Sequence, residues 1–282
     1  MSGFQTYPAP AKLNLFLHVV GRREDGYHLL QTVFRFVDFG DTLSIRVRGD
    51  GRIERVSDLP GVPADKDLVV RAARLLQEAA GVKLGADIGV EKRLPMGGGL
   101  GGGSSDAATV LLALNRLWDV NWSREQLMAL GLKLGADVPI FVYGRNAFAE
   151  GVGEQFTPVD LAPAWYVVLV PPVQVPTAEI FAVQELTRNT LPVKIAPFSA
   201  GPVCLEGHND LEAVVVKRYP VVAEHLGWLK QFSETARMTG SGACVFAAFE
   251  TERQAREVFA SKPAAMQGFV AQGLEKHPLR DL

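Results

Sequence analysis

Cysteine is scarce in this sequence, with only Cys204 and Cys244 among 282 residues. Two cysteines cannot form the disulfide framework of a small secreted domain, and this usage suits a reducing compartment. An excess of one charge is also missing, because 29 Lys and Arg face 31 Asp and Glu, for a formal net charge of -2. Such a balance gives no general field that would attract nucleic acid or an anionic membrane. Any bound phosphate must therefore be held by a local site.

Long hydrophobic runs are missing as well. The apolar stretch at residues 13–20 is interrupted by Asn14 and His18, and no small-residue cleavage site follows it. No segment approaches the roughly 18 uninterrupted apolar residues that a membrane helix needs. The five histidines show no zinc-site spacing, and no Ser/His/Asp triad can be argued. We therefore expect a cytoplasmic protein without an export signal, which contacts neither membranes nor nucleic acid.

The length of the chain predicts two domains or one large one. Hydrophobic residues make up 48% of the sequence, enough for a substantial core without disulfides. The pattern of elements restarts after Pro158. We place a boundary near residue 160, with one domain at residues 1–160 and a second at residues 161–282.

Hydrophobic periodicity and capping residues predict the elements of the first domain. The turn at residues 21–26 is bounded by glycines, and Gly81 is expected to end a helix. The predicted strands are residues 12–19, 42–48 and 86–90, and the predicted helices are residues 67–80, a helix capped by Ser104 or Ser105, and residues 123–134 with a capping box at their start.

The second domain is predicted to contain both strands and helices. The expected strands are residues 165–170, 243–249 and 269–271, and the expected helices are residues 178–186, two within 210–232 divided near Pro220, and 252–261. This β-α-α-β-α-β order is typical of an α+β sandwich with its helices on one face of a sheet. The stretch at residues 192–202 is interpreted as a surface loop.

The most unusual stretch is residues 97–103, in which six of seven residues are glycine. Glycine costs conformational entropy on folding, so the bare backbone must serve a purpose that side chains would prevent. A phosphate cradle at a helix start is the physical candidate, because exposed amides and the helix dipole both attract anions. No Gly-Lys-Ser/Thr follows, so this is not a Walker A loop. A flexible linker is the alternative, although linkers rarely lie between a strand and a capped helix.

Residues 95–107, Pro-Met-Gly-Gly-Gly-Leu-Gly-Gly-Gly-Ser-Ser-Asp-Ala, resemble the phosphate loop of the galactokinase, homoserine, mevalonate and phosphomevalonate kinase (GHMP) superfamily. Four further segments, at residues 10–15, 25–28, 135–139 and 239–243, match the family in order along the chain. The resemblance implies an α+β fold of two domains. These are an N-terminal ATP-binding domain like domain 2 of ribosomal protein S5 and a C-terminal ferredoxin-like α/β sandwich, with the active site in the cleft between them.

The resemblance also implies a reaction. The segments match most closely a member that uses ATP to phosphorylate the 2-hydroxyl of cytidine diphospho-methylerythritol, in the non-mevalonate isoprenoid pathway. Asp137 matches the family's proposed general base, and Lys12 matches its cationic partner. Taken alone, an Asp after a helix end is more often a turn residue, and a Lys on an early strand is usually solvated.

The remaining site residues are carried over from the same motifs. The expected ATP-binding residues are Pro95, Met96, Gly97, Gly98, Gly99, Leu100, Gly101, Gly102, Gly103, Ser104, Ser105 and Asp67. The expected substrate-binding residues are Asn14, Tyr27, His28, Val152, Thr177, Phe181, Gly240, Ser241 and Gly242, with Tyr27 and Phe181 flanking the cytosine ring. Mg²⁺ is expected to accompany ATP, and no protein ligand is assigned, although Ser104 and Ser105 are candidates.

Two acidic residues are unusual for such a site, because Asp67 and Asp106 stand where relatives commonly carry asparagine. A carboxylate beside phosphates is unfavourable unless it points away or meets a cation. Two other functions stay open: a homoserine or mevalonate type of kinase without a cytidine pocket, and a regulatory module that binds a nucleotide without catalysis. We expect a small-molecule substrate and a monomer or weak homodimer.

Overall fold

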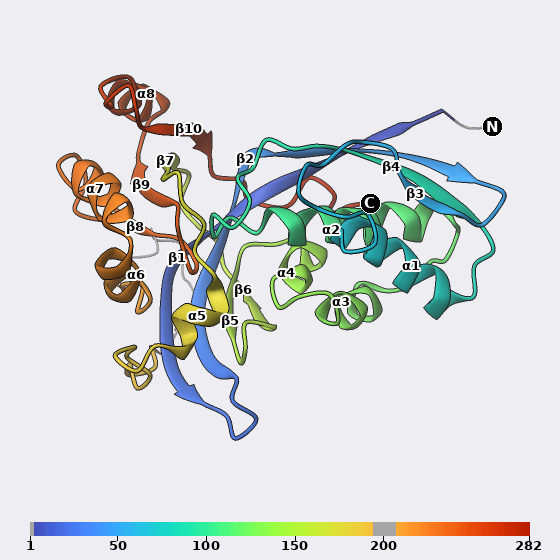
Figure 1. Cartoon of the computed structure of the whole chain (residues 1–282), viewed down its shortest axis with the longest axis horizontal. Helices are drawn as coiled ribbons and strands as arrows, with labels where there is room; N and C mark the ends of the chain where they lie inside the picture. The colour runs from blue at the N-terminus through green and yellow to red at the C-terminus, as the bar shows by residue number, and fades with distance from the viewer. Residues whose placement is uncertain (1–2, 194–206) are drawn as a thin grey trace.

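The computed structural model describes residues 3–193 and 207–282, which form two β-sheets with helices packed against them (Figure 1). Cys204 and most of the loop predicted at residues 192–202 lie outside the described residues. Within the described residues, no helix has the length and apolar character needed to cross a membrane.

A long antiparallel hairpin of β1 (Gln5–Arg22) and β2 (His28–Arg48) extends from the first sheet to the second (Figure 1). Both strands are much longer than the predicted ones. The strand predicted at residues 12–19 lies within β1; its ends were missed, because most of β1 is buried on both faces and the sequence alternates only in part. Register shifts in the hairpin, one of them between Pro10 and Lys12, interrupt the regular pairing. The turn predicted between the strands is confirmed.

The first sheet also contains β3 (Ile53–Arg55), β4 (Gly85–Glu91), β5 (Ala147–Glu150) and β6 (Gln155–Pro158). Their order is β3-β4-β2-β5-β6, and β1 pairs with β2. The strand predicted at residues 86–90 is confirmed as β4. The short strands β5 and β6 were not predicted, because four residues are too few to establish a period.

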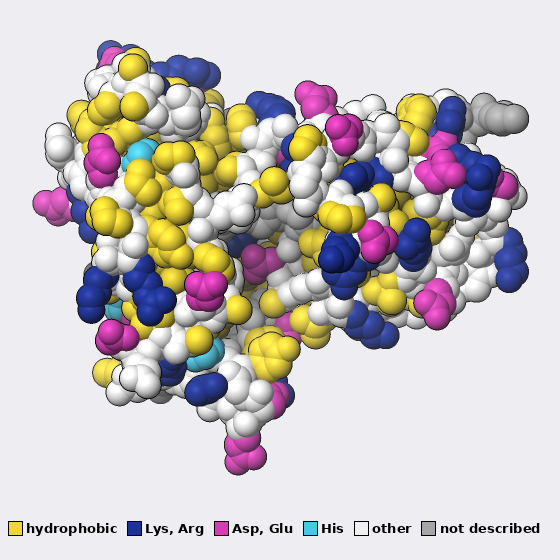
Figure 2. Space-filling view, in the orientation of Figure 1, with side chains coloured by type: hydrophobic (Ala, Val, Ile, Leu, Met, Phe, Trp, Pro, Cys, Tyr) yellow, Lys and Arg dark blue, Asp and Glu magenta, His cyan; other side chains and the backbone are white. Residues whose placement is uncertain are grey.

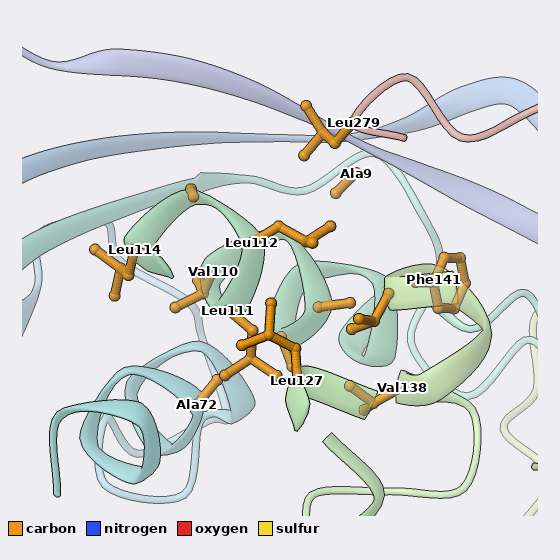
Figure 3. Packing of buried hydrophobic residues seen from close by; sticks show 14 of the residues in the cluster. Ala9, Ala72, Val110, Leu111, Leu112, Leu114, Leu127, Val138, Phe141 and Leu279 are labelled. Carbon is orange, nitrogen blue, oxygen red and sulfur yellow. The ribbon is translucent and has the colours of Figure 1, made fainter. Parts of the chain in front are cut away.

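Four helices cover one face of this sheet: α1 (Leu68–Ala80), α2 (Gly102–Leu117), α3 (Arg124–Leu132) and α4 (Val138–Tyr143). Figure 3 shows the core between them, where Leu111 of α2, Leu127 of α3 and Val138 of α4 converge. The predicted ends of α1 are confirmed, because the Asp67 side chain accepts from Val69 N and Gly81 is left-handed. The capping box predicted for α3 is also present.

Two helix starts differ from the prediction. The helix predicted to be capped by Ser104 or Ser105 begins instead at Gly102, with left-handed Gly101 at its N-cap and no side-chain cap. A prediction from capping residues missed this start, because the glycine backbone is held by tertiary contacts. Helix α4 was not predicted, because a proline usually ends a helix, whereas Pro139 occupies the first turn of a new helix that follows Asp137.

The second sheet is built from β7 (Trp165–Val170), β8 (Arg237–Met238), β9 (Val245–Phe249) and β10 (Gln267–Gln272), in the spatial order β10-β7-β9-β8. The helices between the strands are α5 (Thr177–Ala182), α6 (Glu212–Arg218), α7 (Pro220–Leu229) and α8 (Glu252–Ala260). Strand β8 has two residues and was not predicted. With it, the four strands have the order of a ferredoxin-like sandwich, with three helices (α5, α6 and α7) between β7 and β8 and α8 between β9 and β10. The division of helices at Pro220 is confirmed.

Buried side chains of the second sheet pack against the β1–β2 hairpin of the first. Val167 and Leu169 of β7 face the helices of the second sheet, whereas Tyr166 and Val168 pack against the β1–β2 hairpin. The tail after β10 returns to the first sheet, where Leu279 packs beside Ala9 (Figure 3). The boundary near residue 160 stays a prediction.

Candidate active site

A cavity of about 970 Å³ is lined by residues from both parts of the molecule. In Figure 2 the surface is hollowed between the part that carries the second sheet, at the left, and the part that carries α1–α3, at the right. The predicted site residues that line the cavity are Lys12, Asn14, Tyr27, His28, Asp67, Pro95, Met96, Gly97, Gly98, Gly99, Leu100, Gly101, Gly102, Gly103, Ser104, Asp137, Val152, Thr177, Phe181, Gly240 and Ser241.

Lys12 and Asp137 meet in this cavity although they lie far apart in the sequence. Lys12 Nζ is 3.3 Å from Asp137 Oδ2. The Lys12 side chain is 3% exposed and the Asp137 side chain 39%, so the carboxylate is the member of the pair that solvent or a ligand can reach. An ion pair with one open partner can receive a proton at the carboxylate while the ammonium remains fixed.

Neighbouring oxygens hold the Lys12 ammonium in place. Its Nζ donates to Asn14 Oδ1 at 2.6 Å and to the carbonyl oxygen of Gly99 at 3.0 Å. Asn14 is fixed in turn, because its Nδ2 donates to Thr32 Oγ1 at 2.9 Å and its backbone N–H donates to Thr239 Oγ1 at 3.0 Å. Because Thr32 belongs to β2 and Thr239 follows β8, this chain of hydrogen bonds joins both parts of the molecule at the site.

The glycine loop is packed too tightly for side chains. A Cβ on Gly99 would lie 2.2 Å from the backbone oxygen of Thr239, and one on Gly101 would lie 2.9 Å from the Phe141 ring. Both glycines also have left-handed backbone angles, with φ of +75° and +73°. The loop is therefore a fixed piece of backbone rather than a flexible linker.

Helix α2 directs its N-terminus at the cavity. Gly101 is the N-cap, and the first N–H groups of any helix lack a carbonyl partner one turn back. Gly102, Gly103 and Ser104 of this first turn line the cavity. Free N–H groups and the positive end of the helix dipole both favour an anion at this position.

Two predicted residues are not brought to the cavity wall. Ser105 is buried, its hydroxyl donates to the Pro10 carbonyl at 2.7 Å, and its N–H donates to Gly101 O, so it has no free donor for a phosphate. Gly242 lies beneath Met238, whose Sδ would be 2.7 Å from a Cβ at that position. Ser105 and Gly242 therefore lie behind the cavity wall in this structure, and their assignments to ATP or Mg²⁺ and to substrate stay predictions.

The turn that follows β8 closes the cavity on the side of the second sheet. Ser241 Oγ is 2.6 Å from Thr177 Oγ1, at the start of α5. The Gly240 carbonyl accepts from Asn209 Nδ2 at 2.8 Å. Asn209 was not predicted as a site residue, since nothing in its local sequence distinguishes it from a loop asparagine.

Two rings lie together at the far side of the cavity. The His28 and Phe181 rings have centroids 4.9 Å apart at an interplanar angle of 32°. Tyr27, predicted to flank the same base, is 64% exposed and is free to contact a ligand. Burial, Arg188 and Arg22 lower the pKa of His28, in that order of importance. Arg188 was also missed by the sequence analysis.

The two unusual carboxylates both meet cations. Asp67 receives hydrogen bonds from Val69 N at 3.1 Å and from Arg55 at 2.7 Å. Asp106 lies 2.8 Å from Lys92 Nζ, which also pairs with Asp41.

The pKa values of this cluster follow from its burial. Burial raises the pKa of Asp106 to about 7, because the desolvation cost exceeds the stabilising effect of Lys92, and Asp41 raises it further. Burial alone would lower the pKa of Lys92, but Asp106 and Asp41 raise it above its usual value. Lys92 lines the cavity and was not predicted, although it lies just ahead of the glycine loop.

No group of three or more His, Cys, Asp and Glu residues suited to a metal ion occurs in residues 3–193 and 207–282. Mg²⁺ at kinase sites is often held by one or two protein oxygens together with substrate phosphates and water. Ser104 offers one such oxygen, because it lies in the first turn of α2 and lines the same cavity as Asp137.

Family models match two segments of the chain. The model described as "GHMP kinases N terminal domain" matches residues 67–145, and "GHMP kinases C terminal" matches residues 201–266. The first match contains the glycine loop, Lys92 and Asp137.

Whole-chain relatives agree with these models. The chain is 68% identical to "4-diphosphocytidyl-2-C-methyl-D-erythritol kinase" of Thiobacillus denitrificans, over 98% of both chains. It is 63% identical to the protein of the same name from Nitrosospira multiformis, over 97% of this chain and 92% of that one.

Solved structures give the same result. A crystal structure of 4-(cytidine 5'-diphospho)-2C-methyl-D-erythritol kinase superposes with a TM-score of 0.79 at 34% identity, covering 95% of this chain and 99% of that one. Homoserine kinase from Cytophaga hutchinsonii has a TM-score of 0.72 at 17% identity, covering 98% of this chain and 96% of that one, a likeness of fold alone. This chain belongs to the GHMP kinase family.

Proposed function

We propose that this chain is a kinase that transfers the γ-phosphoryl group of ATP to the 2-hydroxyl of 4-diphosphocytidyl-2-C-methyl-D-erythritol, in the non-mevalonate isoprenoid pathway. One observation carries the proposal: a single cavity is lined by the glycine loop, by the Lys12–Asp137 pair and by the His28–Phe181 rings. The glycine loop would bind the phosphates of ATP, the ion pair would activate the alcohol, and the rings would bind the nucleobase of the acceptor. The names and high identity of the two bacterial relatives support the same substrate.

The phosphate tail of ATP is proposed to lie on the glycine loop. The N–H groups at the start of α2 have no backbone partners within the helix, so phosphate oxygens can satisfy them. Because the loop backbone is fixed by its packing, these donors need no reorganisation when the nucleotide binds. The nucleotide's adenosine end then extends toward Asp67 and Lys92, which line the same cavity.

Asp137 is proposed to accept the proton of the substrate hydroxyl. Direct in-line transfer requires that the acceptor oxygen, the transferred phosphorus and the leaving oxygen lie nearly in line. Lys12, 3.3 Å from the carboxylate, then orients it and offsets negative charge on the transferred group. Lys12 is almost fully buried and anchored to Asn14 and Gly99, so its charge stays at one position during the reaction.

Magnesium is proposed to bind with ATP rather than in a separate protein cage. When bound, it would neutralise phosphate charge. Ser104 is the residue that would hold it, because its hydroxyl lies at the start of α2 and lines the cavity. The chain then needs to supply few ligands of its own.

The substrate is proposed to occupy the part of the cavity nearest the second sheet. Cytosine would stack against Phe181 and Tyr27, while the diphosphate would pass the turn at Gly240 and Ser241. Asn14, beside Lys12, would contact the methylerythritol hydroxyls, and Thr177 and Val152 would complete the wall. The cytoplasmic location and a monomeric or weakly dimeric state stay predictions.

The test offers the purified full-length protein ATP and Mg²⁺ with one acceptor at a time and measures ADP release. The acceptors are 4-diphosphocytidyl-2-C-methyl-D-erythritol, homoserine and mevalonate, and a reaction without acceptor gives the background. The proposal expects turnover with the cytidine compound alone and a product that carries the new phosphate on the 2-hydroxyl. Turnover with homoserine or mevalonate instead, or background rates with all three, would overturn it.

A further inference from the structure

Arg188 is a charged residue beside the cavity for which the proposed function has no role. It follows α5, and its Nε donates a hydrogen bond to Nε2 of His28 at 3.0 Å. Its other nitrogens donate to the backbone carbonyls of Phe181, Val183, Gln184 and Leu186. These four carbonyls fix the plane of the guanidinium group. The remaining N–H, on Nε, therefore points toward His28 in a fixed direction.

The chemistry of this bond determines where the His28 proton lies. A guanidinium has only donors and keeps its proton in proteins, so Nε2 of His28 must be the acceptor. A neutral imidazole with Nε2 unprotonated carries its hydrogen on Nδ1. An imidazolium would place two N–H groups against each other at 3.0 Å. Arg188 therefore selects one tautomer of a neutral ring.

The other groups around His28 also favour its neutral form. Arg22, which pairs with His28 across the β1–β2 hairpin, is the second cation that acts on the ring. Within the described residues, no carboxylate contributes to lowering or raising the pKa of His28. Both cations and the partial burial of the ring oppose its protonation. On its other side the ring lies against Phe181, which has no charge.

We infer that Arg188 is a positioning residue for the substrate, because it holds His28 as the neutral Nδ1–H tautomer and thereby gives the ring one donor for an acceptor on the nucleobase. The Nδ1 atom has no hydrogen-bond partner among residues 3–193 and 207–282, and His28 lines the cavity beside Phe181. The ring-nitrogen and carbonyl acceptors on the edge of cytosine match such a donor. The inference rests on the proposed function for the identity of the base.

The tautomer can be measured without any assay of activity. Long-range proton–nitrogen NMR on the full-length protein at pH 7 reports which ring nitrogens carry hydrogen, and the His28 signals are assigned by their loss in His28→Gln. We expect Nδ1 protonated and Nε2 unprotonated. A ring protonated on Nε2, or on both nitrogens, overturns the inference. This result does not depend on whether the cytidine compound is the substrate.

Kinetics of Arg188→Met test the consequence for binding. Without Arg188 neither the tautomer nor the direction of the neutral ring is fixed, so its hydrogen bond to the base is weakened. Loss of one such bond is expected to raise KM for the cytidine substrate about tenfold at pH 8, which is about 1.4 kcal/mol. kcat and KM for ATP are expected to stay within about threefold. Arg253→Met is the matched control, since the Arg253 side chain is 84% exposed on α8.

The dependence of KM on pH distinguishes this positioning role from a merely structural one. In Arg188→Met the pKa of His28 rises, and the imidazolium formed at lower pH donates from both nitrogens. The ratio of the variant's KM to that of the wild type is therefore expected to fall from pH 8 to pH 5.5. A ratio that is constant over this range, or a KM that never rises, overturns the inference. If the wild type turns over no cytidine substrate, the proposed function fails, and the NMR measurement still decides the tautomer.

Discussion

Replacing Asp137 by asparagine tests the proposed proton acceptor with little change of shape. In the wild type, Asp137 Oδ2 is 3.3 Å from Lys12 Nζ, and its side chain is 39% exposed. An amide cannot accept the hydroxyl proton, so this change removes the acceptor and keeps the volume. General base catalysis contributes about 10²–10⁴-fold, or roughly 3–5 kcal/mol of transition-state stabilisation. We expect kcat to fall by that factor.

The structure also predicts what the substitution leaves unchanged. Lys12 keeps its bonds to Asn14 and Gly99, and a partly exposed ion pair contributes at most about 1 kcal/mol to stability. KM for ATP is therefore expected to change by less than about threefold, and Tm by no more than about 4 °C. Coupled ADP-release kinetics and thermal unfolding measure both. Asp160→Asn, at an exposed aspartate, is the matched control.

Near-normal kcat in Asp137→Asn would refute the assignment. A large loss of ATP affinity or of Tm would refute the argument in another way, because the carboxylate would then be a structural or nucleotide-binding group. Adding Lys12→Met to Asp137→Asn gives a further check. Since the two side chains are proposed to act as a unit, the double variant is expected to lose much less activity than the product of the single losses.

The remaining predictions concern the support of the site. Gly99→Ala is expected to cost about 2–4 kcal/mol of unfolding free energy, measured in urea, because its Cβ would meet a backbone oxygen at 2.2 Å. Gly135→Ala is the control, since a Cβ there would have no atom nearer than 3.8 Å. Equal stability of the two variants would contradict the tight packing of the glycine loop. Lys92→Met is expected to lose about 3–5 kcal/mol of unfolding free energy, because it removes the ammonium that Asp106 shares with Asp41, and Asp41 keeps only the N–H groups of Arg93 and Leu94. Asp106→Asn in the same chain is expected to restore part of this loss; no loss, or no restoration, would count against the cluster. Burial lowers the pKa of His277 to about 3, so its contribution to stability is complete above the unfolded-state pKa near 6.5 and declines by up to roughly 1.4 kcal/mol per unit as pH falls toward 3. His277→Gln is expected to reduce that decline in unfolding experiments between pH 7 and 4, and identical pH profiles would contradict it.

Features set by neighbours in the sequence could be predicted from it. Asp67 and Gly81 delimit α1 as expected, because an N-cap and a left-handed C-cap depend on a few adjacent residues. The capping box at Ser123 depends on Gln126 in the same way. The short strand β8 escaped prediction, since two residues contain no period and their pairing with β9 depends on the sheet.

Features set by distant contacts could be found only through resemblance or through the structure. The start of α2 at Gly102 depends on the packing of Gly101 against Phe141, which the local sequence does not reveal. Matched motifs pointed to Lys12 and Asp137, but their proximity came from the fold. Arg188 meets His28 across 160 residues and belongs to none of the recognised motifs.

The most direct measurement of the central claim is a crystal structure of this chain with a non-hydrolysable ATP analogue and 4-diphosphocytidyl-2-C-methyl-D-erythritol bound together. It is predicted to place phosphate oxygens on the N–H groups at the start of α2 and the 2-hydroxyl between Asp137 and the γ-phosphorus. A triphosphate bound away from the glycine loop, or a 2-hydroxyl beyond hydrogen-bond reach of Asp137, would contradict it.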